Sequence, residues 1–223
     1  MLMNLNFEFM AEYLPLYVDA ARLTIRVSFW GILLALLVGV ICAVLRYYRV
    51  PLLHRIVSGY IEISRNTPLL VQLFFLYFGL PKIGIVWSGE TCAIIGLAFL
   101  GGSYMAESLR SGLQTIEKNQ IESAQSLGMA RLMTMKEVIL PQALAISVPG
   151  LIANVIFLIK ETSVVSGIAL ADLMYVTKDL IGLYYETDEA LIMLVIAYLI
   201  ILLPVSLLAT VLERRLRYAG FGT

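Results

Sequence analysis

Five apolar stretches of about twenty residues each constrain this chain more than any other feature of its sequence. They cover approximately residues 23–45, 56–80, 91–113, 138–159 and 190–212. A helix that crosses the hydrocarbon core of a bilayer needs about 20 mostly apolar residues. Hydrophobic residues make up 60% of the chain and charged residues 14%, whereas globular proteins have about 45–50% and about 25%. We therefore predict an all-α integral membrane protein with about five transmembrane helices in a single domain, residues 1–223.

Two segments fit this pattern less well. Charged residues and Pro68 interrupt the first half of the stretch 56–80, which indicates an amphipathic entry at the membrane surface. The segment 163–187 is apolar only in patches, because charged residues and a glycine break it. We interpret it as a surface or re-entrant segment rather than a sixth span.

Basic residues predict the orientation of the chain. One side of the predicted spans carries Arg46, Arg49, Arg55, Arg110, Lys118, Arg131, Lys136, Arg214, Arg215 and Arg217. Lys82 and Lys178 lie on the other side, where Arg22 and Arg26 run against the pattern. Cytoplasmic loops carry the excess of lysine and arginine. The bias therefore predicts an N-terminus outside, a C-terminus inside and a cytoplasmic loop at 114–137.

This loop contains the pattern of a short helix. Asn119 can cap it, small and apolar residues follow as far as Met129, and Gly128 breaks its regularity. Such a helix fits a groove on a soluble partner. It fits equally well on lipid headgroups as an ordinary amphipathic helix. Composition alone leaves both interpretations open.

The same region resembles the EAA loop of ATP-binding-cassette importer permeases. The resemblance rests on Glu-Ser-Ala at 122–124, on Gly128 and on Val-Ile-Leu-Pro at 138–141. The chain departs from the family pattern at Ser123, where alanine is usual, and at Val138, where isoleucine is usual. In this family the loop docks into a cleft of the ATPase subunit. The resemblance therefore implies coupling roles for Glu122, Ala124, Gly128 and Pro141.

Other segments resemble the polar amino acid uptake branch of that family. They are IEISRNTPLLVQLFFLYFGLP at 61–81, SYMAESLRSGLQTI at 103–116 and LIKETSVVSGIALADL at 158–173. Residues 160–173 and 178–187 are also similar to cystine-type importers, although glutamine, arginine and other polar amino acids remain open. The resemblance covers nearly the whole chain.

The resemblance also implies the partners and the place of the protein in the cell. They are a second permease subunit (in a homodimer or a heterodimer), two cytoplasmic ATPase subunits, an extracytoplasmic substrate-binding protein, and the bacterial cytoplasmic membrane. The sequence contains no GxxxxGK[ST] phosphate-binding loop and no Gly-Lys dipeptide. We therefore expect the ATP to bind to another polypeptide, and we expect this chain to be a non-catalytic subunit without a cofactor or metal of its own.

The fourth predicted span carries a polar stripe. Ser147, Asn154 and Glu161 recur every seven residues, which places them on one face of an otherwise apolar helix. An ionisable residue within a membrane is costly, and it is a functional candidate for that reason. We predict that this stripe lines the substrate pathway. The alternative is that Glu161 only marks the outer end of the span, where water reaches it.

Two pairs of opposite charges stand three residues apart on predicted spans. They are Glu107 with Arg110 and Glu62 with Arg65. Side chains at this spacing share a helix face, so pairing within each helix is the first expectation. Glu107 is also a candidate contact for a substrate with split charges, such as an amino acid.

Two other classes of protein were weighed against a permease. A secondary transporter would need its own coupling-ion site and usually a pseudo-symmetric second half, and neither is visible in the sequence. A membrane scaffold would need no polar stripe along the fourth span.

Overall fold

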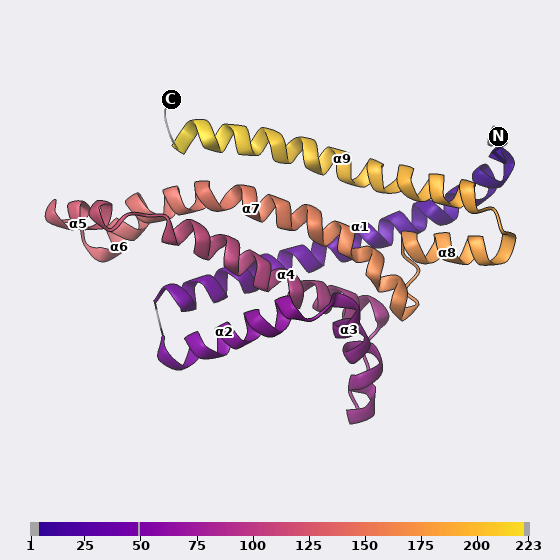
Figure 1. Ribbon diagram of the computed structural model, residues 1–223, viewed down its shortest axis with the longest axis horizontal. Helices are drawn as coiled ribbons and strands as arrows, with labels where there is room; N and C mark the ends of the chain where they lie inside the picture. Colours follow the sequence, from indigo (N-terminus) through magenta and orange to yellow (C-terminus); the bar gives the residue numbers. More distant parts are fainter. Residues whose placement is uncertain (1–4, 49, 221–223) are drawn as a thin grey trace. The chain divides into compact units, whose positions relative to one another are not determined.

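The described part of the chain is helical, with short connections and no β-strand. The computed structural model describes residues 5–48 and 50–220, with side chains as far as residue 213. Figure 1 labels the α-helices α1 (Phe7–Tyr47), α2 (Pro51–Asn66), α3 (Leu69–Phe74), α4 (Gly89–Gln114), α5 (Lys118–Ser126), α6 (Arg131–Thr134), α7 (Leu140–Glu161), α8 (Leu173–Tyr184) and α9 (Thr187–Gly220). Two π-helices, η1 (Phe75–Gly79) and η3 (Met135–Ile139), and two 3-10 helices, η2 (Leu80–Ile83) and η4 (Thr162–Ile168), complete the described helices. The predicted all-α class is confirmed.

Four helical segments within the described residues are long and apolar enough to cross a membrane. They are Phe7–Tyr47, Gly89–Gln114, Arg131–Ile168 and Thr187–Glu213. These segments contain the first, third, fourth and fifth of the stretches predicted from the sequence.

The second predicted stretch, 56–80, is not one helix. Helix α2 ends at Asn66, and a shorter apolar helical segment, Leu69–Ile83, begins after Pro68. Proline lacks an N–H group and disfavours helical geometry in the residue before it. Pro68 itself is extended, with φ −58° and ψ 142°. The break follows from this proline, and the sequence analysis underestimated its effect.

The segment 163–187 contains most of η4 and all of α8. Helix α8 has 12 residues and is therefore about 18 Å long. A hydrocarbon core is about 30 Å thick, and α8 is not one of the candidate spans among the described residues. This agrees with the expectation that no sixth span forms here.

Each π-helix is followed directly by a Leu-Pro pair, at 80–81 and at 140–141. In each pair the leucine N–H donates to the carbonyl oxygen five residues earlier, that of Phe75 or that of Met135. A proline inside a helix cannot donate, and its ring collides with the carbonyl of the preceding turn. One wider turn before the proline moves that carbonyl away and replaces the usual hydrogen-bond pattern locally.

The chain forms two compact units. Unit 1 comprises Met1–Leu33, Thr67–Ala98 and Ile156–Ser206, and unit 2 comprises Leu34–Asn66, Phe99–Val155 and Leu207–Thr223. The chain passes from one unit to the other within α1, α4, α7 and α9, and between α2 and α3.

The core of unit 1 joins the first part of α1 to α8 and to the first part of α9. Its buried members are Phe9, Tyr17, Ala20, Leu173, Val176, Leu180, Met193 and Leu194. The Tyr17 hydroxyl donates to the carbonyl oxygen of Ala190 at 2.9 Å and lies 2.9 Å from Thr177 Oγ1. A buried phenol needs such partners, because an unpaired polar atom in the core is costly.

Two arginines of unit 1 run against the predicted orientation, and both are paired with carboxylates. Arg22 lies 2.8 Å from Asp19, and Arg26 lies 2.7 Å from Glu90 at the start of α4. Pairing reduces the cost of these charges. Of the basic residues that predict the orientation, Arg49 and the side chains of Arg214, Arg215 and Arg217 lie outside the part of the chain that the structure describes.

The core of unit 2 has two clusters. The first joins α1, α2 and α4 through Cys42, Val57, Ile61 and Ala106. The second lies where the loop after α4 meets η3 and α7, and it consists of Ile116, Ile139 and Ala143 with partly buried neighbours. This second cluster supports the segment between α4 and α7.

Candidate functional site

The predicted short helix is present in unit 2 as α5, but it starts two residues earlier than Asn119. Its cap is Glu117, whose backbone is extended with φ −67° and ψ 140°, and the side chain of Glu117 makes no capping hydrogen bond. Asn119 lies within the helix, so its predicted role as the cap is wrong. The extended backbone of Glu117, rather than a side-chain acceptor, sets the start of α5.

Gly128 ends α5 as predicted. Its φ is +84°, a conformation that glycine adopts without strain. The N–H of Gly128 donates to the carbonyl oxygen of Gln125 at 2.9 Å, and the N–H of Met129 donates to that of Ala124 at 3.1 Å. These two bonds form a Schellman cap. A Cβ at Gly128 would meet nothing within 4 Å, so backbone conformation and not space explains the glycine here.

The two faces of α5 differ in exposure. Ala124 is only 5% exposed and packs inside the chain, whereas the sequence analysis placed it at the contact with a partner. Glu122 is exposed, and Leu127 just after the helix is 84% exposed. The outward face of the segment therefore presents one carboxylate and one large apolar side chain beside the Gly128 turn.

Pro141 is the second residue of α7, and its ring is exposed. A proline this close to a helix start costs little, because the first N–H groups of a helix have no intrahelical partner. Together with η3, it fixes the direction in which the chain leaves the α5–α6 segment. Its role is to shape the backbone, since it contributes no hydrogen-bond donor.

The structure places Ser147 and Asn154 against α4. Ser147 is buried and donates to the carbonyl oxygen of Ala143 at 2.7 Å. A Cβ at Gly112 of α4 would lie 2.1 Å from Ser147 Oγ. Asn154 Nδ2 donates to Ser108 Oγ of α4 at 2.9 Å. This part of the predicted stripe faces protein, and it holds two helices at close range within unit 2.

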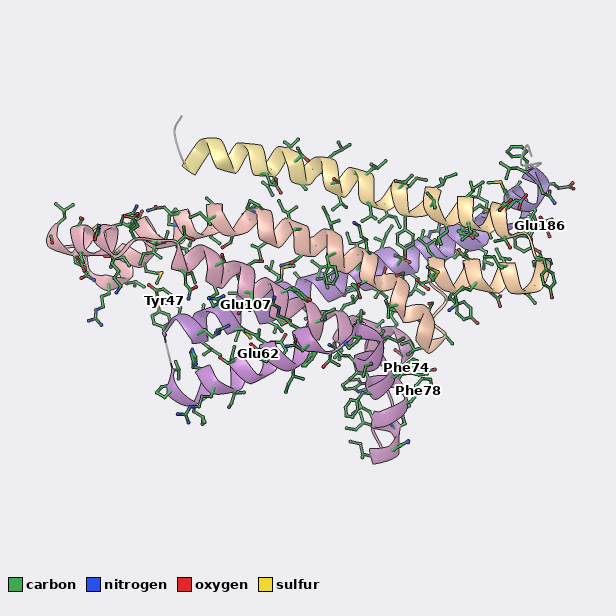
Figure 2. All side chains as sticks on the ribbon, viewed as in Figure 1. Tyr47, Glu62, Phe74, Phe78, Glu107 and Glu186 are labelled. Atoms are coloured by element: carbon green, nitrogen blue, oxygen red, sulfur yellow. The ribbon has the colours of Figure 1, made fainter. Side chains whose placement is uncertain are left out.

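Glu107 is the centre of an ion-pair cluster in unit 2 (Figure 2). Its carboxylate accepts hydrogen bonds from Arg46 of α1 and, at 2.6 Å, from Arg110. The predicted pairing of Glu107 with Arg110 is confirmed, and Arg46 is a third member that the sequence did not reveal. Two arginines satisfy this carboxylate, as a partly buried charge requires.

The predicted pairing of Glu62 with Arg65 is wrong. Within the described residues, Glu62 accepts a hydrogen bond from the side chain of Asn66, one helical turn later, at 3.2 Å. The Arg65 guanidinium lies over the ring of Tyr104, 5.3 Å from its centroid. An aromatic face attracts a guanidinium, and this competes with a surface ion pair of small value.

Glu161 ends α7 and lies in unit 1, half-buried. Its carboxylate takes part in none of the side-chain hydrogen bonds or ion pairs found in the described part of the chain. A half-buried carboxylate without a partner differs clearly from the saturated carboxylate of Glu107. Of the four predicted pathway residues, Glu161 is the one with free capacity to bind.

Asp172 is a buried acid that the sequence analysis treated only as a break in an apolar segment. It is 1% exposed and caps α8, with Oδ1 accepting the N–H of Tyr175 at 2.9 Å. Its Oδ2 has no hydrogen-bond partner among the described residues. Burial raises the pKa of Asp172 to about 6. An aspartate directly before a helical segment is a cap signal that could have identified its role.

Comparison with known proteins places these features in a family. Residues 35–218 match the family of binding-protein-dependent transport system inner membrane components. A probable amino-acid ABC transporter permease protein, PatM of Vibrio harveyi, is 38% identical over 175 residues, which are 77% of this chain and 78% of that protein. A probable glutamine ABC transporter permease protein, GlnP of Bacillus subtilis (strain 168), is 38% identical over 74% of this chain and 75% of its own length.

Solved structures have the same fold. A crystal structure of an amino acid ABC transporter with histidines contains a chain with a TM-score of 0.88 and 33% identity, covering 96% of this chain and 100% of that one. An inward-facing structure of the MetNI methionine ABC transporter gives a TM-score of 0.74 at 20% identity, covering 92% and 98%. The second likeness concerns the fold alone.

Proposed function

Because the chain belongs to the family of binding-protein-dependent transport system inner membrane components, we propose that it forms the translocation pathway of an ATP-driven importer for polar amino acids. It is a multi-pass protein of the bacterial plasma membrane. The names of its relatives, an amino-acid permease and a glutamine permease, support an amino acid as the substrate. The permease itself makes and breaks no covalent bond, since ATP is bound and hydrolysed by separate subunits.

The observation that carries the proposal is the α5 segment between two candidate spans. Its inward face is anchored by Ala124, and its outward face presents Glu122 and Leu127 beside a rigid glycine turn. A short helix with an exposed apolar anchor is suited to a groove on another protein. We propose that this face docks on a cytoplasmic ATPase, and that Gly128 and Pro141 fix its direction.

The complete importer would contain two permease subunits, two ATPase subunits and an extracytoplasmic binding protein. The second permease is either a copy of this chain or a similar one. ATP binding would close the ATPase pair, move the docked α5 segments and open the pathway outward, and hydrolysis would reset it. This scheme needs the N-terminus outside and the α5 segment in the cytoplasm.

Orientation is tested by cysteine labelling. We expect a cysteine at Lys118 to react with an impermeant thiol reagent only from the cytoplasmic side, and a cysteine at Lys82 only from outside. Both side chains are exposed within the chain, so the variants should fold. The reverse labelling pattern would refute the orientation and, with it, the cytoplasmic ATPase contact.

Coupling is tested with Gly128→Asp. Aspartate is among the non-glycine residues that tolerate positive φ best, so this change adds bulk and charge at the outward face with limited strain. We expect the permease to insert normally but to lose ATPase binding or coupled uptake. Gly59→Asp is the matched control, because Gly59 is also exposed with nothing within 4 Å. Coupled uptake that survives in Gly128→Asp would remove the α5 segment from the joint.

We propose Glu161 as the pathway residue that meets the ammonium group of the substrate. Its unpartnered carboxylate supports this role, whereas the contacts of Ser147, Asn154 and Glu107 support packing of the helices around the pathway. Glu161→Gln should reduce uptake while ATPase association persists, and unchanged uptake would return Glu161 to the role of a wet helix end. Screening amino acids for stimulated ATPase activity, with cystine first and glutamine, arginine and histidine next, would identify the substrate.

A further inference from the structure

A groove in unit 2 lies beside the α5 segment and has a volume of about 350 Å³. Tyr47 and Tyr48 at the end of α1 form one wall; Figure 2 labels Tyr47. Gln125 of α5 and Arg131 of α6 contribute polar groups, while Ile121 and Ile139 belong to the apolar cluster beneath. The groove therefore combines an apolar floor with polar and aromatic walls.

The charge of this groove is unbalanced. Arg131 is the one charged side chain among the residues that line it, and no carboxylate is among them. Arg131 is exposed and takes part in none of the ion pairs found within the described residues. Arg46, one residue before Tyr47, is instead held by Glu107. A guanidinium with free donors is suited to bind a phosphate group through two hydrogen bonds.

The walls point to a lipid as the source of that phosphate. The candidate span Phe7–Tyr47 ends at the groove, so the groove lies at the level where a bilayer gives way to water. Tyrosines are enriched at this level. Leu132 also lines the groove and is 78% exposed, and an exposed apolar side chain at an interface can enter the acyl boundary. A free phosphate would use Arg131 but neither the apolar floor nor Leu132.

We propose that this groove binds the headgroup of an anionic phospholipid, with the phosphate on Arg131 and the glycerol region over Ile121 and Ile139. The assignment to the cytoplasmic leaflet rests on the orientation in the proposed function, whereas the binding itself does not. Such a lipid would sit between the end of α1 and the α5 segment, and it would brace the segment from the membrane side.

The test uses the full chain in nanodiscs of phosphatidylcholine, with and without phosphatidylglycerol. Lipids retained after release are counted by native mass spectrometry, and Tm is measured in both compositions. We compare Arg131→Gln with Arg55→Gln, which removes another exposed arginine outside the groove. We expect Arg131→Gln to weaken phosphatidylglycerol retention roughly tenfold, as loss of a charged hydrogen bond implies, and Arg55→Gln to retain it. Both variants should match the parent chain in phosphatidylcholine alone.

Three outcomes would overturn the proposal. Equal retention of phosphatidylglycerol in the two variants would show that Arg131 does not hold the lipid. Stabilisation by inorganic phosphate, added to phosphatidylcholine nanodiscs, would indicate a simple anion site. Loss of ATPase co-purification in Arg131→Gln with unchanged lipid retention would assign the groove to the partner subunit. Lipid retention is measured without ATP or amino acid, so its failure is distinguishable from a failure of the transport function.

Discussion

The two π-helices offer a controlled comparison between the units, because the same device has opposite results. In unit 1, η1 and Leu80-Pro81 lead to a helix end at Gly84, whose φ is +87°. In unit 2, η3 and Leu140-Pro141 lead into α7, which continues to Glu161. A Leu-Pro pair after a wide turn therefore does not by itself decide whether a helix stops.

The residues after each proline explain the difference. Lys82 and Ile83 are exposed, Ile83 at 72%, so no packing within unit 1 supports a longer helix there. After Pro141, Ala143 is buried in a cluster with Ile116 and Ile139. Tertiary packing supplies most of the stability of a helix. The comparison teaches that burial after the proline, rather than the proline, sets the fate of the helix.

The largest expected effect is on the packing that lets α7 continue. Gly112→Ala puts a Cβ at 2.1 Å from Ser147 Oγ and 2.4 Å from the carbonyl oxygen of Ala143, so α4 and α7 must separate. We expect a loss of about 1–3 kcal/mol or more of the free energy of unfolding, seen as a lower Tm. Gly59→Ala, with nothing within 4 Å, should instead be neutral or stabilising by about 0.5–1 kcal/mol. Similar losses in both variants would contradict the packing argument.

The second effect concerns pH and distinguishes the units by their helix caps. Asp172 caps α8 in unit 1 with a side chain, whereas Glu117 starts α5 in unit 2 without one. Burial raises the pKa of Asp172 to about 6 in the folded chain, so the folded state binds more protons than the unfolded one between the two pKa values. Stability from this group is present below about pH 4 and falls as the pH rises to about 6, by on the order of 2 kcal/mol. Unfolding measured across this range should lose that slope in Asp172→Asn and keep it in Glu117→Gln.

A third, smaller effect tests the helix end in unit 1. Gly84→Ala forces a side chain into positive φ, which costs about 1–2 kcal/mol, although a Cβ there meets nothing within 4 Å. Gly84→Asn should be milder, because asparagine tolerates this conformation. The order of Tm values should be glycine, asparagine, alanine. A stable Gly84→Ala protein would show that the turn can rearrange.

The smallest effects are expected at the prolines themselves. Pro81→Ala and Pro141→Ala should each change stability by less than about 1 kcal/mol, chiefly through the unfolded chain. Amide hydrogen exchange should show that α7 keeps its protection without Pro141 and that the helix in unit 1 still ends at Gly84 without Pro81. Protection that extends past Gly84 in Pro81→Ala would return control of the helix end to the proline.

Hydropathy and spacing predicted the elements whose stability comes from length and composition. Four spans, the short helix before Gly128 and the Glu107–Arg110 pair followed from periodicity and from side chains three residues apart. The prediction was wrong where a distant residue decides. Arg46 joins Glu107 from 61 residues away, and Tyr104 draws Arg65 from Glu62. Asp172 has a visible cap signal, but its burial depends on the packing of α8, which a single sequence does not reveal.

The hydroxyl of Tyr17 has a consequence for how the chain is made. Its partners Thr177 and Ala190 follow it by 160 and 173 residues. At a synthesis rate of about 5–20 residues per second, the first helix waits roughly 10–30 s for them. During that time its phenol and the apolar face around it are incompletely covered. A ribosome that stops before α9 therefore releases a chain with an unfinished outer core, which quality-control proteases in the membrane can recognise.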